Sequence, residues 1–238
     1  MSMRQGNRRV RKSIAIIGEG LTEYRYVDDM RTTERYRFSL VPGIPKHSDI
    51  DDIVNLARER VNAGYDYVLC LIDMDVVEGN HEKMEHYRAL KKANPKIIFV
   101  ESSPCTEYWF LMHYMPGPSS KEYADYDAVA QELKKHIPNY EKTEAFFNKT
   151  HIYRELKEKG NMAKAIELSR DLDKLHETEP EASLSLHFLP EMFQRMWRMQ
   201  EMKMRMKTVM EEINGGWLKL FCVKNFHYVF KKRKTYLH

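Results

Sequence analysis

Cysteine is scarce in this 238-residue sequence, which contains only Cys70, Cys105 and Cys222. No two of them form a Cys-x-x-Cys pair. An odd number of cysteines without paired spacing argues against both a disulfide framework and a zinc site. We therefore expect a reducing, cytoplasmic environment.

Long apolar runs are also absent. The basic amino-terminal residues are followed only by the short apolar run 14–17, which is far shorter than a signal-peptide core, and no later run approaches the length of a membrane span. We expect no membrane partner. The sequence also lacks a P-loop, so an ATPase activity linked to this protein would come from a separate partner.

An excess of one charge sign is missing as well. Charged residues make up 31% of the chain, but the net charge is only +4, so no strong field surrounds the whole molecule. Affinity for nucleic acid would have to come from local basic patches, which either contact phosphates or form solvated tails. Two such patches are Arg8, Arg9, Arg11 and Lys12 near the start, and Lys231, Lys232, Arg233 and Lys234 near the end.

The first half of the chain alternates short apolar runs with segments of helical spacing, and 42% apolar residues suffice for a core. This alternation predicts a parallel sheet covered on both faces, an α/β Rossmann-like domain over residues 13–118. The predicted strands are 14–17, 37–41, 68–72 and 97–100. The predicted helices between them are 22–35, 49–62 and 81–93.

Residues 119–238 are predicted to form a helical region that packs on this core, with no strand signal between residues 121 and 213. The predicted helices are 128–136, 142–159, 162–176 and 187–213. The last helix carries a stripe at spacings of three and four: Met192, Met196, Met199, Met206, Met210 and Ile213. Such a stripe either packs within the protein or forms an interface with another copy or a different subunit. Residues 217–230, rich in Leu, Phe, Val and Tyr, fit a strand or a terminal helix equally.

Acidic residues follow three of the predicted strands. Glu19 lies between Gly18 and Gly20 directly after the first strand. Asp73 and Asp75 end the third, and because side chains alternate along an extended chain, we expect both to point the same way. Glu107 lies in the first turn of a helix predicted to follow the fourth. The carboxyl ends of parallel strands form the binding crevice, so these acids are candidate site residues.

An oxygen-rich acidic cluster suits Mg²⁺ or Mn²⁺, which stabilise charge on a phosphoryl group and activate water. Each feature also has a structural explanation. An Asp-x-Asp can cap a helix, and Glu23 is either a metal ligand or an acid in the first turn of a helix. Lys142 either contacts a phosphate or is solvated, and the aromatic residues 108–110 either fill the core or stack on bases.

Three segments resemble the RloB family, a branch of the Toprim-like proteins related to the OLD nucleases. They are IIGEGLTEY at 16–24, LIDMD at 71–75 and SPCTEYWFLMHY at 103–114. The resemblance continues weakly at 140–142 and 181–187 and covers most of residues 13–195. This chain departs from the family at two positions. It has Gly18 where the family commonly has cysteine, and Met74 where the family frequently has arginine.

The resemblance implies a Toprim fold, an acidic metal site and a link to restriction and antiphage defence. Glu19 matches the invariant Toprim glutamate and Asp73 and Asp75 its Asp-x-Asp, while Glu23 and Glu107 match positions of less certain role. Two functions follow. One is a metal-dependent nuclease acting on DNA or on structured RNA such as tRNA. The other is a non-catalytic subunit that binds nucleic acid or a nucleotide in a defence complex with an ATPase.

Overall fold

The computed structural model describes residues 12–198 except 37, 119–122, 177–183, 187–188 and 197. The side chains of residue 76 and of several residues beside these gaps are not described either. The chain separates into two compact units, 1–192 and 193–238, and the first is described below. Several features named above lie outside the described residues: Arg8, Arg9, Arg11, Cys222, the second basic patch and the whole of 214–238. Of the predicted helix 187–213, residues 189–196 are helical, and most of the rest lies outside the description.

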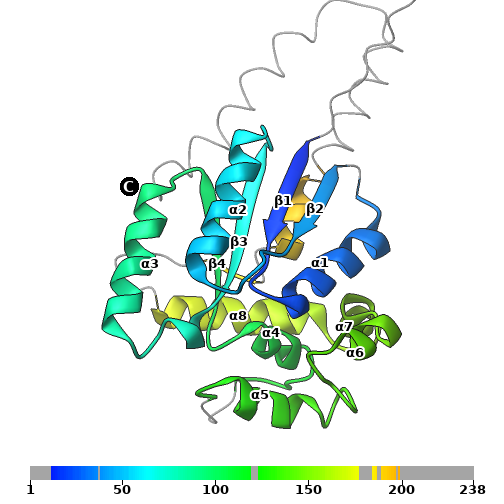
Figure 1. Ribbon diagram of the computed structural model, residues 1–238. Coiled ribbons are helices and arrows are strands. Elements are labelled where there is room, and N and C mark those ends of the chain that lie inside the picture. The colour runs from blue at the N-terminus through cyan, green and yellow to red at the C-terminus, as the bar shows by residue number, and fades with distance from the viewer. Residues whose placement is uncertain are drawn as a thin grey trace, which may run out of the picture. The chain divides into compact units, whose positions relative to one another are not determined.

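A parallel β-sheet forms the centre of the first unit (Figure 1). Its spatial order is β2-β1-β3-β4-β5, and every neighbouring pair runs parallel. The strands are β1 (Ser13–Ile17), β2 (Ser39–Gly43), β3 (Tyr67–Asp73), β4 (Ile97–Ser102) and β5 (Leu184–Ser185). The predicted α/β class is therefore confirmed, and β1 to β4 coincide closely with the predicted runs.

The strand β5 corrects the prediction that residues 121–213 contain no strand. Its two residues pair with β4, Leu184 beside Val100 and Ser185 beside Glu101. Two residues are too few to produce the alternating pattern that identifies a strand in a sequence. Their conformation depends on pairing with a strand more than 80 residues earlier in the chain.

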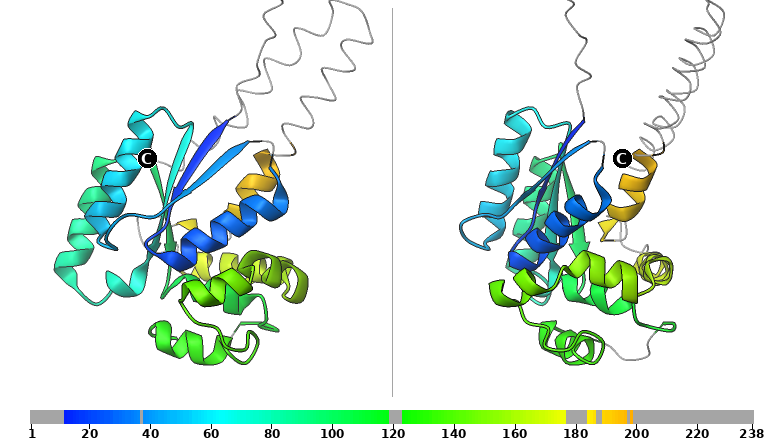
Figure 2. Two further views of the ribbon diagram at one scale, coloured as in Figure 1. Left: turned by 45° about the vertical axis from the view of Figure 1, so that its right-hand side comes forward. Right: turned by 90° about the vertical axis from the view of Figure 1, so that its right-hand side faces the viewer.

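Helices cover both faces of the sheet, as Figure 2 shows. Ala15 and Ile17 of β1 face a buried cluster with residues of α2 (Ile50–Asn62) and α3 (His81–Ala93). Because side chains alternate along a strand, Ile14 and Ile16 face the opposite side, where α1 (Leu21–Glu34) lies. Burial on both faces explains why β1 and β3 are continuous apolar runs rather than alternating ones.

The carboxyl-terminal helices lie beneath the carboxyl ends of the strands (Figures 1 and 2). They are α4 (Thr106–Met112), α5 (Tyr126–Leu133), α6 (Glu144–Lys149), α7 (Ile152–Lys159) and α8 (Met162–His176). The helix α4 packs on both α5 and α8, and α7 packs on α1. Among the described residues, no helix combines the length and apolarity needed to cross a membrane.

The single helix predicted at 142–159 is instead two helices, α6 and α7. Thr150 ends α6 in an extended conformation, and α7 starts after His151. The buried Asp29 of α1 accepts a hydrogen bond from the Arg154 backbone N–H at 3.0 Å and so satisfies a donor in the first turn of α7. The break therefore depends on a contact with a distant helix.

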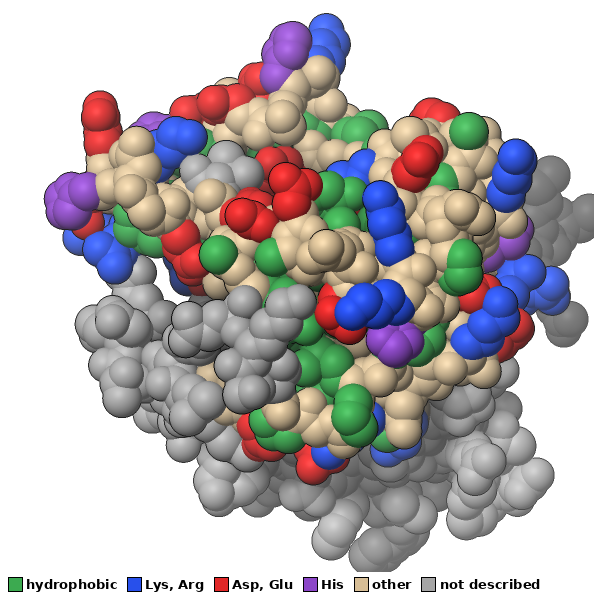
Figure 3. Space-filling view, turned by 90° about the horizontal axis from the view of Figure 1, so that it is seen from below, with side chains coloured by type: hydrophobic (Ala, Val, Ile, Leu, Met, Phe, Trp, Pro, Cys, Tyr) green, Lys and Arg blue, Asp and Glu red, His purple; other side chains and the backbone are tan. Residues whose placement is uncertain are grey.

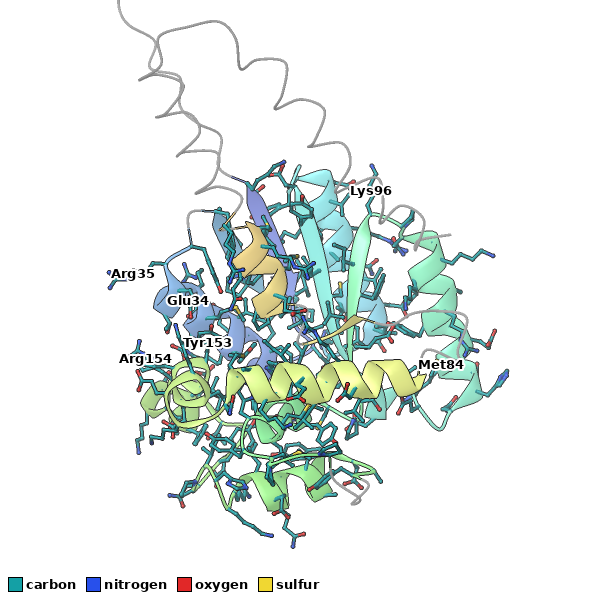
Figure 4. The ribbon with its side chains drawn as sticks, turned by 180° about the vertical axis from the view of Figure 1, so that it is seen from behind. Glu34, Arg35, Met84, Lys96, Tyr153 and Arg154 are labelled. Atoms are coloured by element: carbon teal, nitrogen blue, oxygen red, sulfur yellow. The ribbon has the colours of Figure 1, made fainter. Side chains whose placement is uncertain are left out.

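A second contact fixes α7 against α1. The Tyr153 hydroxyl donates to Glu34 Oε1 at 2.7 Å, and Lys157 Nζ lies 2.5 Å from the same oxygen. Figure 4 shows Tyr153 and Glu34 next to each other where the two helices meet. Since α1 begins at the carboxyl end of β1, these contacts hold the helical region against that edge of the sheet.

Candidate functional site at the carboxyl edge of the sheet

The turn between β1 and α1 presents Glu19 at the sheet edge. A Cβ atom at Gly18 would lie 2.3 Å from Glu23 Cβ, closer than two carbon atoms can approach. Glycine at this position therefore allows the close packing of the turn in this chain. The Gly20 backbone N–H donates to Glu23 Oε2 at 2.8 Å, so Glu23 caps its own helix from the first turn. Glu19 lies between these two constraints.

Asp73, the last residue of β3, reaches the start of α4. It is buried, and its Oδ1 accepts hydrogen bonds from the Thr106 backbone N–H at 2.8 Å and from the Thr106 hydroxyl at 2.9 Å. The Asp73 backbone N–H in turn donates to Glu19 Oε2 at 3.4 Å. The structure thus brings together Glu19 and Asp73, which are 54 residues apart in the chain.

Asp75 reaches the same region by a different route from the one predicted. The strand ends at Asp73, and Asp75 lies in the short 3₁₀ helix η1 (Met74–Val76), so the expected alternation along an extended chain is wrong here. The Asp75 backbone N–H donates to the Pro104 carbonyl at 2.9 Å. Its carboxylate is nonetheless near enough to Glu19 to raise the pKa of that residue.

Glu107, in the first turn of α4 as predicted, is completely buried. Its Oε1 accepts hydrogen bonds from the Thr22 hydroxyl at 3.1 Å and the Tyr140 hydroxyl at 2.7 Å. Its Oε2 has no hydrogen-bond partner but lies 3.2 Å from Lys142 Nζ, so the pair interacts by charge. Neither Thr22 nor Tyr140 was singled out in the sequence. For Tyr140, the weak family resemblance at 140–142 was the available signal.

Glu19, Glu23, Asp73, Asp75 and Glu107 together form what we call the carboxylate cluster. Burial raises the pKa of Glu19 from its ordinary 4.5 to about 7, and the charges of Glu23 and Asp75 add to this effect. Burial also raises the pKa of Glu23, with the Glu107 charge as the next cause. A carboxyl group has a raised pKa where nearby hydrogen bonds and positive charges do not offset its lost hydration and the repulsion from other carboxylates.

Asp73 and Lys142 show the same excess of negative charge. Burial raises the pKa of Asp73 well above its usual range, and the charges of Glu23 and Glu107 raise it further. Burial by itself would lower the pKa of Lys142, but the attraction of Glu107 and the other carboxylates outweighs it and raises that pKa. One ammonium group therefore faces several carboxylates and leaves an excess of negative charge.

A divalent cation suits this excess. The donors are all oxygen atoms, which Mg²⁺ and Mn²⁺ prefer, and Figure 3 shows acidic side chains gathered on the face beneath the strand ends. Within the described parts of the chain, however, no three His, Cys, Asp or Glu side chains converge into a ready-made metal site. Mg²⁺ commonly uses only one or two protein carboxylates and completes its shell with water and substrate phosphate, so the cluster fits this ion.

The remaining candidate residues lie in different places. Lys12 pairs with Asp66 at the amino end of the sheet, opposite the carboxylate cluster. Lys142 lies at the cluster, with its Nζ 4.0 Å from the centre of the Tyr126 ring. In α4, residues 109–111 belong to the core, whereas Tyr108 is partly exposed.

The fold and the site define an α/β protein with a parallel sheet and an acidic site at its carboxyl edge. The model of the RloB-like protein family matches residues 14–199, and the chain belongs to this family. The match spans the sheet, the carboxylate cluster and Lys142. Searches among curated proteins and among solved structures found no match to the chain.

Proposed function

We propose that this protein is a metal-dependent nuclease of the RloB and Toprim type, which hydrolyses phosphodiester bonds of DNA or of structured RNA such as tRNA in antiphage defence. The observation that supports this most is the carboxylate cluster at the carboxyl ends of β1 and β3. Its acids keep raised pKa values although Lys142 lies among them. Clustered, uncompensated carboxylates destabilise a fold unless a cation binds them.

In this proposal one or two of the carboxylates of Glu19, Asp73 and Asp75 bind Mg²⁺ or Mn²⁺ directly, and the rest, with Glu23, contribute negative charge. A bound cation supplies charge neutralisation at the phosphoryl group and a more acidic water. Thr106 fixes Asp73 through two hydrogen bonds, so the carboxylate is oriented before substrate arrives.

Lys142 and Glu107 act as a pair in this proposal. Glu107 is held by Thr22 and Tyr140 and positions the lysine. The Lys142 side chain is 38% exposed, so its ammonium group can reach a substrate phosphate. There it would stabilise the charge that develops in the transition state.

The second candidate function is a non-catalytic subunit that binds nucleic acid or a nucleotide and acts with a separate ATPase. Two observations favour it. Lys142 already neutralises part of the negative charge, and no three ligands converge among the described residues. In this case Lys142 would hold a phosphate without any hydrolysis.

Cleavage assays separate the two functions. The wild-type protein, Asp73→Asn and the control Glu59→Gln are incubated with single- and double-stranded DNA and with structured RNA, with Mg²⁺, Mn²⁺ or EDTA. Glu59 is exposed in the last turn of α2, which leads to the amino end of β3, away from the site. The asparagine oxygen can still accept both Thr106 hydrogen bonds, so folding should persist.

The nuclease proposal predicts metal-dependent cleavage by the wild type and by Glu59→Gln. Asp73→Asn should lose on the order of 100-fold or more in rate while its circular dichroism spectrum stays unchanged. If the wild type cuts none of the substrates but binds them with a steep salt dependence, the second function is favoured instead.

A further inference from the structure

Three partly exposed tyrosines lie on α4, on α5 and just before α5, two helices that pack on each other, and we call them the tyrosine rim: Tyr108, Tyr123 and Tyr126. Tyr108 directly follows Glu107 in α4, and its ring centroid lies 5.4 Å from that of Tyr123. Tyr126 is the first residue of α5. All three are partly exposed, whereas Trp109 and Phe110, the next residues of α4, are buried.

The position of Tyr126 connects the rim to the candidate site. Lys142 Nζ lies 4.0 Å from the Tyr126 ring centre and 3.2 Å from Glu107 Oε2, so one ammonium group joins the ring and the cluster. Burial raises the pKa of Tyr126, and the Glu107 charge is the next cause. A phosphate at Lys142 would therefore lie beside an aromatic surface. Figure 3 shows hydrophobic side chains, drawn in green, next to acidic ones on the face seen from below.

The rim differs from the tyrosines that serve the fold. The buried Tyr26 accepts a hydrogen bond from Trp109 Nε1, and the buried Tyr140 donates one to Glu107. These two residues place the whole ring inside the protein. The rim tyrosines are instead partly exposed, and one of them, Tyr126, lies beside the cation Lys142. Exposed aromatic rings next to a positive charge are the combination that binds unpaired nucleotides.

We propose that the substrate binds as an unpaired strand, with one or two bases stacked on the tyrosine rim and the adjoining phosphate at Lys142. This inference rests on the proposed function only in taking the ligand to be a nucleic acid. Within a duplex, both faces of each base are already stacked on neighbouring bases and are not available to a tyrosine ring. The rim therefore selects single strands, loops or nucleotides flipped out of a helix. Stacking of this kind tolerates any base.

Binding is measured with Ca²⁺ in place of Mg²⁺, so that affinity is read without relying on hydrolysis. Fluorescence anisotropy compares a short labelled single strand with its duplex at one salt concentration. The variants are Tyr108→Ala, Tyr123→Ala and the conservative Tyr108→Phe. The control is Tyr65→Ala, since Tyr65 lies between α2 and β3 at the opposite edge of the sheet. Circular dichroism verifies that each variant is folded.

The inference predicts that the wild type binds the single strand more tightly than the duplex. Each rim alanine should weaken single-strand binding by roughly 10-fold, with Tyr108→Phe and Tyr65→Ala close to the wild type. A 2-aminopurine base in the strand should lose fluorescence on binding, and less so in the alanine variants. Equal affinity for duplex and single strand, or alanine variants that bind like the wild type, would overturn the inference.

The two proposals fail in distinguishable ways. If the wild type binds single strands through the rim but cleaves nothing, the nuclease function is wrong and the inference stands. If cleavage depends on Asp73 but single and double strands react alike in the wild type and the rim variants, the inference is wrong and the nuclease function stands.

Discussion

Replacing Glu19 by Gln removes a charge that the folded, metal-free protein holds at an energetic cost. The pKa of Glu19 rises from 4.5 to about 7 on folding, chiefly because the side chain is buried. Each pH unit corresponds to 1.36 kcal/mol, so the difference of about 2.5 units sets an upper limit of about 3.4 kcal/mol. Glu19 remains partly exposed, and solvent screening lowers this figure to roughly 1.5 kcal/mol.

The direction in which stability changes with pH depends on whether the folded or the unfolded protein binds the proton. Between pH 4.5 and about 7 the folded protein keeps a proton on Glu19 that the unfolded chain has lost. The free energy of unfolding of the wild type therefore falls as the pH rises through this window. Glutamine does not titrate. Glu19→Gln should thus match the wild type near pH 4.5 and exceed its free energy of unfolding by roughly 1.5 kcal/mol above pH 7.

Urea unfolding in EDTA at several pH values across this window measures the effect, with Glu59→Gln as the matched control. The difference between Glu19→Gln and the wild type should grow with pH, while the control shows no trend. Added Mg²⁺ should stabilise the wild type more than Glu19→Gln, because the ion binds the ionised carboxylate. A stability difference that is the same at both ends of the window would refute the reasoning.

Three further predictions concern the packing and charge around the carboxylate cluster. Gly18→Ala should lower the free energy of unfolding by about 2 kcal/mol, because the new methyl group collides with Glu23; urea unfolding tests this, and an unchanged midpoint would contradict it. Tyr140→Phe should lower the free energy of unfolding by about 1.5–3 kcal/mol, because the buried Glu107 carboxylate loses a hydrogen-bond donor. A change below about 0.5 kcal/mol in the same assay would show that this hydrogen bond contributes little to stability. Lys142→Met removes the positive charge that favours the ionised carboxylates, so the pH at which Mn²⁺ binding is half-maximal should rise. Titration calorimetry at a series of pH values measures this midpoint, and a midpoint that stays fixed or falls would contradict the prediction.

Local patterns in the sequence were sufficient to predict the sheet and the proximity of Glu19 and Asp73. Buried parallel strands are continuous apolar runs, and their carboxyl ends meet at one edge. This placed Glu19 and Asp73 together correctly, as the hydrogen bond from the Asp73 backbone to Glu19 shows. The structure adds the reason for Gly18, since a Cβ atom there would collide with Glu23.

Features that depend on distant contacts could not be predicted. Glu107 receives its hydrogen bonds from Thr22 and Tyr140, which are 85 and 33 residues away in the chain. No periodicity connects these three residues. Likewise, the break between α6 and α7 follows a contact with Asp29 of α1. The predicted path of the chain after Asp73 was wrong for a related reason, since the 3₁₀ turn is hydrogen-bonded to Pro104, which lies about 30 residues further along the chain.

The most direct test of the account is whether the carboxylate cluster binds a divalent cation. Isothermal titration calorimetry with Mn²⁺ is performed at about pH 7 on the wild type, Asp73→Asn and Glu59→Gln, in two buffers of different ionisation enthalpy. The account predicts binding with release of protons, since Glu19, with its pKa of about 7, must lose one, and binding at least about 10-fold weaker in Asp73→Asn. The absence of binding to the wild type, or equal binding to all three proteins, would contradict it.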